Sequence, residues 1–500
     1  MDGRWAMSEI RVKTASGRWI LLATVLGSGI AGIDATVVNI ALPTIGLDLG
    51  TDFAALQWMV TGYTLTLASF ILLGGSLGDR FGRRRIFIVG VVWFAVASLL
   101  CGLAPNAGLL IAARSLQGVG GALLTPGSLA IIQASFAGED RARAIGAWSG
   151  LGGVATAIGP FLGGWLVESF SWRWIFFINV PIAAAAIWIA ARHVPETRDT
   201  EATGRLDVGG ALLGALALAG TTYALIEAPA QGIGAPAVLA SGALGLAAAL
   251  AFLVVEWRTE HPMLPLRIFG NRQFSAANAV TFLIYAVFGG VFFLLVIHLQ
   301  VVAGFSPLAS GTAMLPITAL MLVLSPRAGA FSSRIGPRIP MTVGPLLCAA
   351  ALVLMLRIGP GASYLVDVLP SVIVLGLGLS LLVAPLTSTA LSAVPERQAG
   401  LASGVNNAVA RAAGLIAIAV LPAAVGLTGD ASSNPHVFKA GFDAACMIGA
   451  VVLVLSGILA AATIRNPALP ESDHPTHCAL DGTPAAPGAL REARSGADQA

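Results

Sequence analysis

The side chains of this chain that could do chemistry are a few charged groups set inside long apolar stretches. Asp34 is the only acid in the apolar stretch 19–44, and Arg114 lies a few residues into the stretch 107–132. A charged group inside a membrane-like environment costs about 3 kcal/mol or more unless it faces protein or water. We therefore expect Asp34 to bind and release a proton, with Arg114 as its partner. The alternative is a structural carboxylate that stays paired with a cation.

Asp34 and Arg114 can reach one another if both stretches are helices. Asp34 precedes Pro43, near one end of its stretch, by nine residues, which is about 14 Å at about 1.5 Å per residue. Arg114 follows the start of its own stretch by seven residues, which is about 10 Å on the same measure. An arginine side chain can bridge that difference in depth. Protonation of Asp34 would then release Arg114, which is our hypothesis for how a proton drives movement.

A second group of charges lies in the short loop 75–85, between two apolar stretches. The loop carries one acid and four arginines, although only 11% of the chain is charged. Arginines can anchor such a loop on one side of a membrane, but they do not explain the acid, since only Lys and Arg set orientation strongly. We therefore predict that Asp79 acts as a latch between moving parts rather than as a substrate contact. The predicted gating residues are Gly75, Asp79, Arg80, Gly82, Arg83 and Arg84.

The composition requires an all-α protein that crosses a membrane many times. Hydrophobic residues make up 56% of the 500 and charged residues 11%, against about 25% charged residues in soluble domains. A crossing takes about 20 apolar residues, and each crossing in lipid must be helical because its backbone groups need internal partners. Fourteen stretches qualify: 19–44, 54–75, 86–104, 107–132, 143–168, 173–191, 207–227, 236–256, 274–299, 309–330, 340–358, 367–391, 400–425 and 440–463.

The distribution of positive charge predicts the orientation. Most of the 28 Lys and Arg residues fall on the N-terminal side of the membrane, and the positive-inside rule makes that side cytoplasmic. An even number of helices places both termini there, and the net charge of +3 then reflects topology rather than nucleic-acid binding. The predicted segments are a cytoplasmic N-terminus at 1–18, a six-helix bundle at 19–191, two linker helices at 207–256, a second six-helix bundle at 274–464 and a disordered cytoplasmic tail at 465–500.

An internal repeat divides the chain into two halves. A shift of 254 positions superimposes two separate groups of residues: Gly75, Arg80, Gly82 and Arg84 on Gly329, Arg334, Gly336 and Arg338, and Gly146, Ser149 and Gly150 on Gly400, Ser403 and Gly404. The helices of the two halves therefore run in the same order and direction, with the stretch 207–256 inserted between them. Parallel repeats of this kind build a substrate path between the halves of one large class of transporters.

The loop 75–85 resembles the signature loop of the major facilitator superfamily, Gly-x-Leu-x-Asp-Arg-x-Gly-Arg-Arg. The segment Ile33–Pro43 is similar to a motif of fourteen-helix drug:proton antiporters of the QacA/EmrB type. Further matches are Arg114-Ser-Leu-Gln117-Gly118, Gly159-Pro160-Phe-Leu-Gly163-Gly164 and Trp172-Arg-Trp-Ile-Phe-Phe-Ile-Asn-Val-Pro181. The resemblance covers residues 19–464, and it carries no information on the substrate.

This resemblance implies roles for two of the motifs. Gly159, Pro160, Gly163 and Gly164 correspond to the antiporter motif, which is thought to shape and seal the cavity. Asp79 is expected to latch onto the stretch 400–425. Ser333 stands where the repeat would place a second acid, so we expect the latch to be one-sided.

Large and polar side chains within the stretches are candidates for the walls of a substrate cavity, because amphiphiles bind apolar walls that carry a few polar groups. Each of them is also compatible with ordinary packing against protein or lipid. The candidates are Asn39, Trp58, Tyr63, Gln117, Trp148 and His298, together with Tyr285 and Phe292.

The predicted function is proton-coupled export of amphiphilic small molecules across the bacterial cytoplasmic (inner) membrane. The expected partners are the substrate, protons and the bilayer, without nucleic acid, and a periplasmic adaptor is a possible partner in a Gram-negative source. The proton gradient would be the energy source, with no cofactor and no metal, since His474, His477 and Cys478 lie in the predicted disordered tail. The alternatives are an uptake symporter on the same fold and, less favoured, a polytopic membrane enzyme. A nucleotide-driven pump is not expected, because the phosphate-binding motif Gly-x-x-x-x-Gly-Lys-[Ser/Thr] is absent.

Overall fold

A computed structural model describes residues 10–198, 207–259, 262, 264–395, 398–429 and 434–466, and the regular secondary structure within these ranges is helical throughout. Fourteen helical segments of these ranges are long and apolar enough to cross a membrane, and they match the fourteen predicted stretches. The predicted tail from 467 onward, with His474, His477 and Cys478, lies outside the described residues, as do residues 1–9 of the predicted N-terminal segment.

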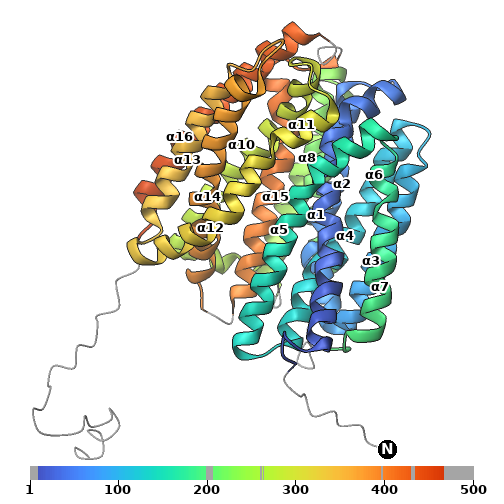
Figure 1. Ribbon diagram of the computed structural model, residues 1–500, viewed down its shortest axis with the longest axis vertical. Helices are drawn as coiled ribbons and strands as arrows, with labels where there is room; N and C mark the ends of the chain where they lie inside the picture. Colours follow the sequence, from blue (N-terminus) through green and yellow to red (C-terminus); the bar gives the residue numbers. More distant parts are fainter. Residues whose placement is uncertain are drawn as a thin grey trace, which may run out of the picture. The chain divides into compact units, whose positions relative to one another are not determined.

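The helices form two groups that lie side by side (Figure 1). The first group contains α1 (Ala15–Leu49), α2 (Phe53–Phe81), α3 (Arg83–Gly102), α4 (Ala107–Ser135), α5 (Gly138–Ser169), α6 (Trp174–Phe177) and α7 (Asn179–His193). The second contains η1 (Leu266–Gly270), α10 (Arg272–Val301), α11 (Pro307–Ala313), α12 (Leu315–Ile335), α13 (Arg338–Met355), η2 (Tyr364–Val368), α14 (Leu369–Ser392), α15 (Ala399–Ala424) and α16 (Pro435–Thr463). Between them in sequence come α8 (Val208–Gln231) and α9 (Pro236–Arg258). We call the first and second groups the N half and the C half.

The two halves pack their helices in the same pattern. In the N half α4 packs against α2 and α3, and α1 packs against α5 and α7; in the C half α14 packs against α12 and α13, and α10 packs against α15 and α16. The turn that ends α2 and the turn that ends α12 are also alike, because Gly82 and Gly336 both have positive φ, 109° and 87°. Only glycine adopts such angles readily. These shared features are what a parallel repeat with an offset of 254 predicts.

Two predicted crossings are interrupted. The predicted stretch 173–191 forms α6 and α7, with the break at Ile178, and the stretch 309–330 falls across α11 and α12, with the break at Met314. Pro181 and Pro316 follow these breaks, and each lacks the N–H that would bond to the carbonyl four residues earlier. The interruption at Ile178 brings Asn179 to the start of a new helix, inside the N half.

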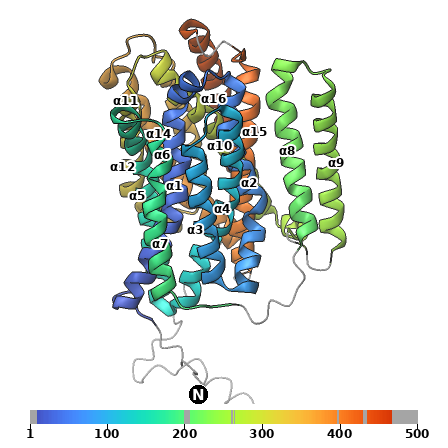
Figure 2. The same cartoon turned by 90° about the vertical axis from the view of Figure 1, so that its right-hand side faces the viewer.

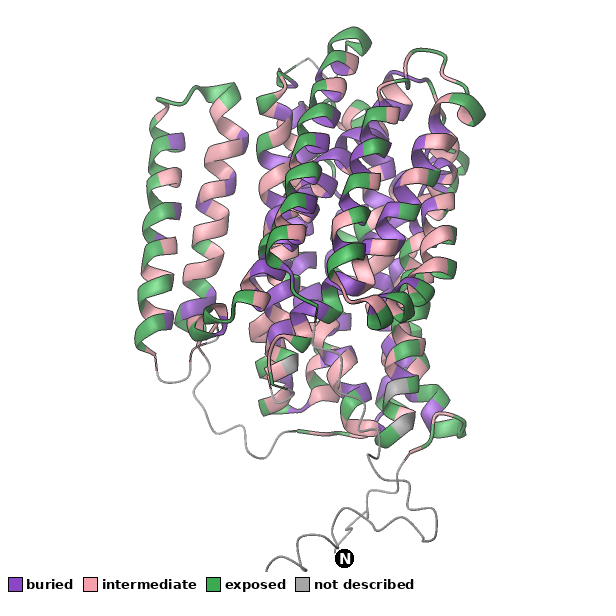
Figure 3. Ribbon diagram, turned by 90° about the vertical axis from the view of Figure 1, so that its left-hand side faces the viewer, coloured by how far each residue is buried: buried purple, intermediate pink, exposed green. Residues whose placement is uncertain are grey.

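Helices α8 and α9 pack mainly against each other and stand to one side of the two halves (Figure 2). Few of their residues are buried (Figure 3). Helix α8 contacts both α2 and α15, and the Trp58 indole N–H on α2 donates to Glu227 Oε1 on α8 at 3.0 Å. The inserted pair is therefore attached along the line where α2 of the N half meets α15 of the C half.

Close helix contacts in the N half depend on glycine. A Cβ added at Gly120 on α4 would lie 2.7 Å from the backbone nitrogen of Phe94 on α3. At Gly146 on α5, by contrast, no heavy atom lies within 4 Å of the Cβ position. Small residues of this kind let helices approach in lipid, where packing replaces the hydrophobic effect as the driving force.

We predict that Gly120→Val destabilises the purified protein by about 1–3 kcal/mol, the usual cost of overpacking, because α3 and α4 must move apart. The measurement is the midpoint of thermal unfolding in detergent micelles. Gly146→Val is the matched control, and its midpoint should stay close to that of the unmodified protein. Equal midpoints for the two variants would contradict the role assigned to Gly120.

Candidate functional site

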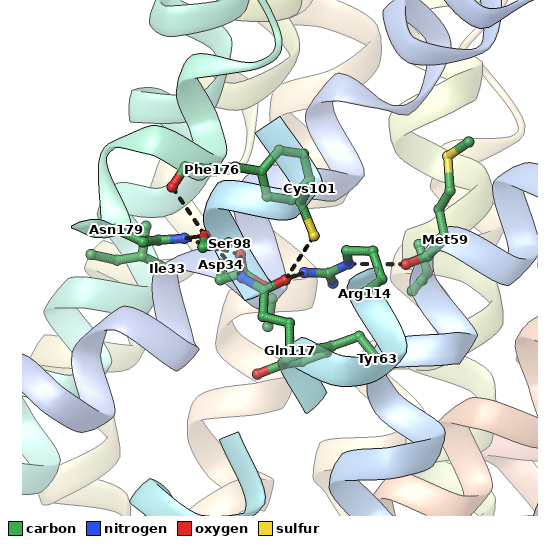
Figure 4. Close-up of polar contacts among 12 residues, drawn as sticks. Ile33, Asp34, Met59, Tyr63, Ser98, Cys101, Arg114, Gln117, Phe176 and Asn179 are labelled. Carbon is green, nitrogen blue, oxygen red and sulfur yellow. Dashed lines mark hydrogen bonds and ion pairs between the residues drawn. The ribbon is translucent and has the colours of Figure 1, made fainter. Parts of the chain in front are cut away.

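The centre of the candidate site is the Asp34 carboxylate, which is fully buried in the middle of α1. Its Oδ2 accepts a hydrogen bond from Arg114 Nη1 on α4. Its Oδ1 accepts from Gln117 Nε2 at 2.8 Å and from Asn179 Nδ2 at 3.2 Å (Figure 4). The carboxylate thus has three donors from two other helices, and the pairing with Arg114 predicted from the sequence is confirmed.

Arg114 is equally enclosed, with 1% of its surface exposed. Besides Asp34, it donates to Gln117 Oε1 at 2.6 Å and, through Nε, to the backbone carbonyl of Met59 at 3.1 Å. The guanidinium carbon lies 4.4 Å from the centroid of the Tyr63 ring and 5.9 Å from that of Phe176. The negative faces of the two rings attract the cation, so aromatic contacts on two sides add to the compensation from Asp34.

A second layer of hydrogen bonds holds these partners in place. Ser98 Oγ on α3 accepts from Asn179 Nδ2 at 2.9 Å and from Gln117 Nε2 at 3.2 Å, and it donates to the carbonyl of Phe176 at 3.0 Å. The network therefore joins α1, α3, α4, α6 and α7 of the N half. These donors satisfy the oxygens of a carboxylate that has no access to water.

The predicted gating loop makes its contacts within the N half. Asp79 Oδ1 accepts from Arg83 Nε at 2.8 Å, one turn further along. Arg84 and Arg85 both approach Glu196 Oε2, at 3.6 and 3.7 Å, and Arg84 also donates to the carbonyl of Val194. The remaining predicted residues hold the turn between α2 and α3: Gly82 supplies the positive φ, Arg80 lies over the Phe81 ring at 5.7 Å, and the Cβ position of Gly75 lies 3.6 Å from Pro126.

Among the described residues, no hydrogen bond or ion pair joins Asp79 to α15, its predicted partner helix. The latch therefore stays a prediction, for a conformation in which the two halves meet at this end of the helices. We call this end, where α2 ends and α3 begins, the Asp79 end. The opposite end, where α1 ends and α2 begins, we call the Asp48 end.

The predicted antiporter motif lies where α5 crosses between α1 and the C half. The Cβ position of Gly159 falls against Thr36 Oγ1, and that of Gly163 against Val37. On the other side of α5, the Cβ position of Gly164 lies 2.6 Å from Cα of Leu308, while α11 presents its own glycine, Gly311, to the Pro160 carbonyl. The small residues of the motif thus bring α5 close to α1 of the N half and to α11 of the C half.

Further bonds between the halves also lie toward the Asp48 end. Gln57 Nε2 on α2 donates to the Ile418 carbonyl on α15 at 2.6 Å, and Gln300 Nε2 on α10 donates to the Ile40 carbonyl on α1 at 2.9 Å. The backbone N–H of Leu308 on α11 donates to Glu168 on α5 at 3.2 Å. Toward the Asp79 end, by contrast, α5 has no heavy atom within 4 Å of the Cβ positions of its four glycines from 146 to 153.

The predicted cavity residues do not form one group. Tyr63 and Gln117 belong to the Asp34 network. Trp58 faces Glu227 and Tyr223 of α8. His298 is buried inside the C half, where its ring stacks 4.0 Å from that of Phe442 and its Nε2 lies 3.0 Å from the Ile358 carbonyl.

The remaining candidates lie on helices at the interface between the halves. Trp148 on α5 donates to Ser28 on α1 at 2.7 Å, and Asn39 donates only within its own helix, at 3.5 Å. Tyr285 and Phe292 are partly buried on α10. Within the described ranges no three His, Cys, Asp or Glu side chains gather in a way that could hold a metal.

Comparison with known proteins decides the family. The family model described as "Major Facilitator Superfamily" matches residues 24–419 of this chain. The chain belongs to the major facilitator superfamily. It is a multi-pass membrane protein, and its bacterial relatives in this superfamily agree with a place in the cytoplasmic membrane.

Several relatives of this major facilitator protein are resistance proteins. The puromycin resistance protein pur8 of Streptomyces alboniger is 38% identical over 412 residues, which is 81% of each chain. The multidrug resistance protein Stp of Mycobacterium tuberculosis is 35% identical over 84% of this chain and 78% of its own. The tetracenomycin C resistance and export protein of Streptomyces glaucescens is 38% identical over 80% of this chain and 74% of its own.

Solved transporter structures share the fold. A POT family transporter in complex with 5-aminolevulinic acid superposes with a TM-score of 0.67 over 90% of this chain and 98% of its own, at 13% identity. An inward-facing bacterial homologue of the lysosomal transporter Spinster gives 0.64 over 91% of this chain and its whole length, at 18% identity. At these identities the similarity concerns the fold alone.

Sequence reasoning missed two members of the network in this major facilitator protein, Ser98 and Asn179. Asn179 stands in the matched segment Trp172–Pro181 as a polar residue among apolar ones, so a signal was present. Ser98 is a small residue in α3, and serines of that kind commonly bond to their own helix. Only the break between α6 and α7 shows why Asn179 and Ser98 meet.

We predict that Asn179→Leu lowers the free energy of unfolding by about 1–3 kcal/mol, because Asp34 and Ser98 each lose a donor in a buried place. The measurement is thermal unfolding of the purified protein in detergent. Asn39→Leu is the matched control on α1, where the amide makes only the bond of 3.5 Å within its own helix. A larger loss for Asn39→Leu than for Asn179→Leu would contradict the network described above.

Proposed function

We propose that this protein is a proton-coupled exporter that moves amphiphilic small molecules out of the bacterial cell by alternating access, rather than an enzyme. The observation that carries the proposal is the buried Asp34 carboxylate, bound by one cation and two amides within the N half. The resistance and export proteins that are 35–38% identical to this chain support the outward direction and the drug-like substrates. The proton gradient would supply the energy.

Charge balance gives the proton its effect. With Asp34 ionised, Arg114 has a partner and the network is complete. With Asp34 protonated, Arg114 becomes a buried cation without a counter-charge, and breaking a buried pair in this way typically costs about 3–5 kcal/mol. The two protonation states therefore favour different arrangements of the N half, which is the differential interaction that a proton needs in order to shift a conformational equilibrium.

The antiporter motif offers a route from Asp34 to the C half. Asp34 and Thr36 lie on the same helix, and Thr36 packs against Gly159 on α5 while donating to the Thr156 carbonyl at 3.2 Å. The next residue, Pro160, presents its carbonyl to Gly311 of the C half. A shift of α1 that follows protonation would thus reach the contact between the halves through α5.

The positive-inside rule orients the transporter in this proposal. The loop 75–85 places its arginines at the Asp79 end, so this end and both termini would face the cytoplasm. The α5 contacts between the halves lie toward the Asp48 end, which would face outward. In this conformation the N half and the C half would be in contact at the outer end. The protein would then be inward-facing and could bind substrate from the cytoplasm.

We predict that Asp34→Asn abolishes proton-coupled transport, because an amide cannot release a proton. In an efflux-deficient bacterium, tolerance to a panel of puromycin, other antibiotics and cationic dyes is measured first. Respiring inverted vesicles then receive the compound with the largest effect, and proton release is followed with a pH-sensitive dye. Release should occur with the unmodified protein and fall to the level of empty vesicles with Asp34→Asn.

Asp48→Asn on the same helix is the matched control. Asp48 has a side chain that is 48% exposed, pairs with Arg173 at the rim and should be dispensable for proton release. Full proton release by Asp34→Asn would disprove the coupling role. Accumulation of the compound by intact cells would instead indicate uptake.

We also predict that Gly311→Ala shifts the protein away from the present conformation, because the added Cβ overlaps the Pro160 carbonyl. A clash of about 1–3 kcal/mol changes a conformational equilibrium by about 5- to 150-fold. Energy transfer between dyes attached through Leu47→Cys and Val437→Cys, both exposed at the Asp48 end, should report a greater separation of the halves. Gly153→Ala on α5, where space is open, is the control, and an unchanged separation in Gly311→Ala would contradict this role of the contact.

A further inference from the structure

A second cation lies deep in the membrane-spanning part of the protein, and it has no counter-charge. Arg411 is near the middle of α15, about 18 Å from either end at about 1.5 Å per residue. Its Nε is enclosed without a hydrogen-bond partner, and no ion pair among the described residues includes it. Arg114, by comparison, has a carboxylate, an amide, a carbonyl and two rings. An uncompensated cation at this depth is costly, and such residues usually serve a function.

The register of α2 against α15 places Tyr63 beside Arg411. The two helices run antiparallel, and two contacts fix their alignment: Gln57 donates to the Ile418 carbonyl, and Leu72 lies 2.8 Å from the Cβ position of Gly404. Counting six residues along α2 from Gln57, and six back along α15 from Ile418, brings Tyr63 level with Ala412, the neighbour of Arg411 in the chain. Tyr63 belongs to the N half and Arg411 to the C half, so this pair lies across the interface between them.

Two phenols share this region with the cation. Tyr63 is 2% exposed, and its hydroxyl group is buried without a hydrogen-bond partner. Tyr285 on α10 lies next to α15, with its carbonyl 3.7 Å from the Cβ position of Gly414. Tyr63 and Tyr285 lie on α2 and α10, the helices that pack against α15 here, and the electrostatic interaction of both phenols with Arg411 agrees with this placement. An Nε–H group and a hydroxyl group, both enclosed without a hydrogen-bond partner, are thus carried by neighbouring helices of the two halves.

We propose that Arg411, Tyr63 and Tyr285 form an anion-binding subsite between the two halves, which takes the carboxylate of an amphiphilic substrate. A guanidinium offers a planar pair of N–H groups that matches the two oxygens of a carboxylate, and a phenol can donate a further bond. The subsite rests on the proposed transport function and specifies its substrate class as anionic or zwitterionic amphiphiles. A purely cationic compound would be repelled by Arg411.

Tyr63 connects this subsite with the proton site. One face of its ring lies under the Arg114 guanidinium, while its helix, α2, packs against the helix that carries Arg411. A carboxylate that engages the hydroxyl group of Tyr63 therefore contacts a side chain that also packs on the partner of Asp34. Substrate and proton would thus act on neighbouring atoms without sharing a binding group.

The test compares three probes that have the same ring and different head groups: naphthalene-1-acetate, naphthalene-1-acetamide and 1-naphthylmethylamine. Binding to the full-length purified protein in lipid nanodiscs is measured by calorimetry at pH 7.5. The unmodified protein should bind the carboxylate at least about tenfold more tightly than the amide, a difference of about 1.4 kcal/mol, and the amine most weakly. Arg411→Gln should remove this preference, and Arg411→Lys should keep part of it.

Two further variants separate the possible failures. Arg357→Gln, at an exposed arginine that pairs with Asp367, should keep the preference for the carboxylate. Proton release by the unmodified protein and by Asp34→Asn is measured separately in inverted vesicles, so a failure of the coupling proposal is distinguishable from a failure of the subsite. If Arg411→Gln does not fold, Arg411→Lys and Tyr285→Phe must each reduce the preference. Equal or unmeasurable binding of the three probes by the unmodified protein, or an unchanged preference in Arg411→Gln, overturns the proposal.

Discussion

The ion pair between Asp34 and Arg114 sets the conditions for the whole N half. Neither charge can stay in an apolar interior alone, and each therefore requires the other together with neutral donors and acceptors around it. Gln117, Asn179 and Ser98 supply those groups from three different helices. The helices must approach closely enough for the bonds to close, and glycines such as Gly120 permit that approach. In the N half the buried charges can therefore be compensated only if the helices pack closely.

The C half repeats the architecture without repeating this chemistry. The offset of 254 carries Asp34 to Phe288 and Arg114 to Val368, so the equivalent positions are apolar. The C half encloses His298 against Phe442, and among the described residues Arg411, near the interface, has no ion-pair partner. The two halves therefore share the same arrangement of helices but differ in their buried charges. The N half contains the ion pair of Asp34 and Arg114, and the C half contains Arg411 without an ion-pair partner among the described residues.

The fold could be predicted from the sequence because it depends on properties that a sequence carries directly. The fourteen crossings follow from hydropathy, and the repeat follows from glycines such as Gly82 and Gly336, whose backbone angles no other residue adopts as easily. The pair of Asp34 and Arg114 was also predictable, since two opposite charges in apolar stretches at compatible depth need one another. Ser98 and Asn179 were not, because their meeting depends on the interruption at Ile178. The partners of Trp58 and His298 likewise depend on how whole helices pack, which local composition does not specify.

Helix α8 lies across the line between the two halves, and this position restricts how they can move. The hydrogen bond from Trp58 to Glu227 attaches α8 to α2. Helices α8 and α9 would therefore move together with the N half. Any rotation of the C half must then shear α15 past α8. The α15 side of that contact carries Ala419 and Ala423, and a small void of about 30 Å³ separates these residues from Ile226 and Pro229 of α8. Small side chains beside a gap of this size would interlock little with α8, so α15 could slide past α8 while α8 stays in contact with it.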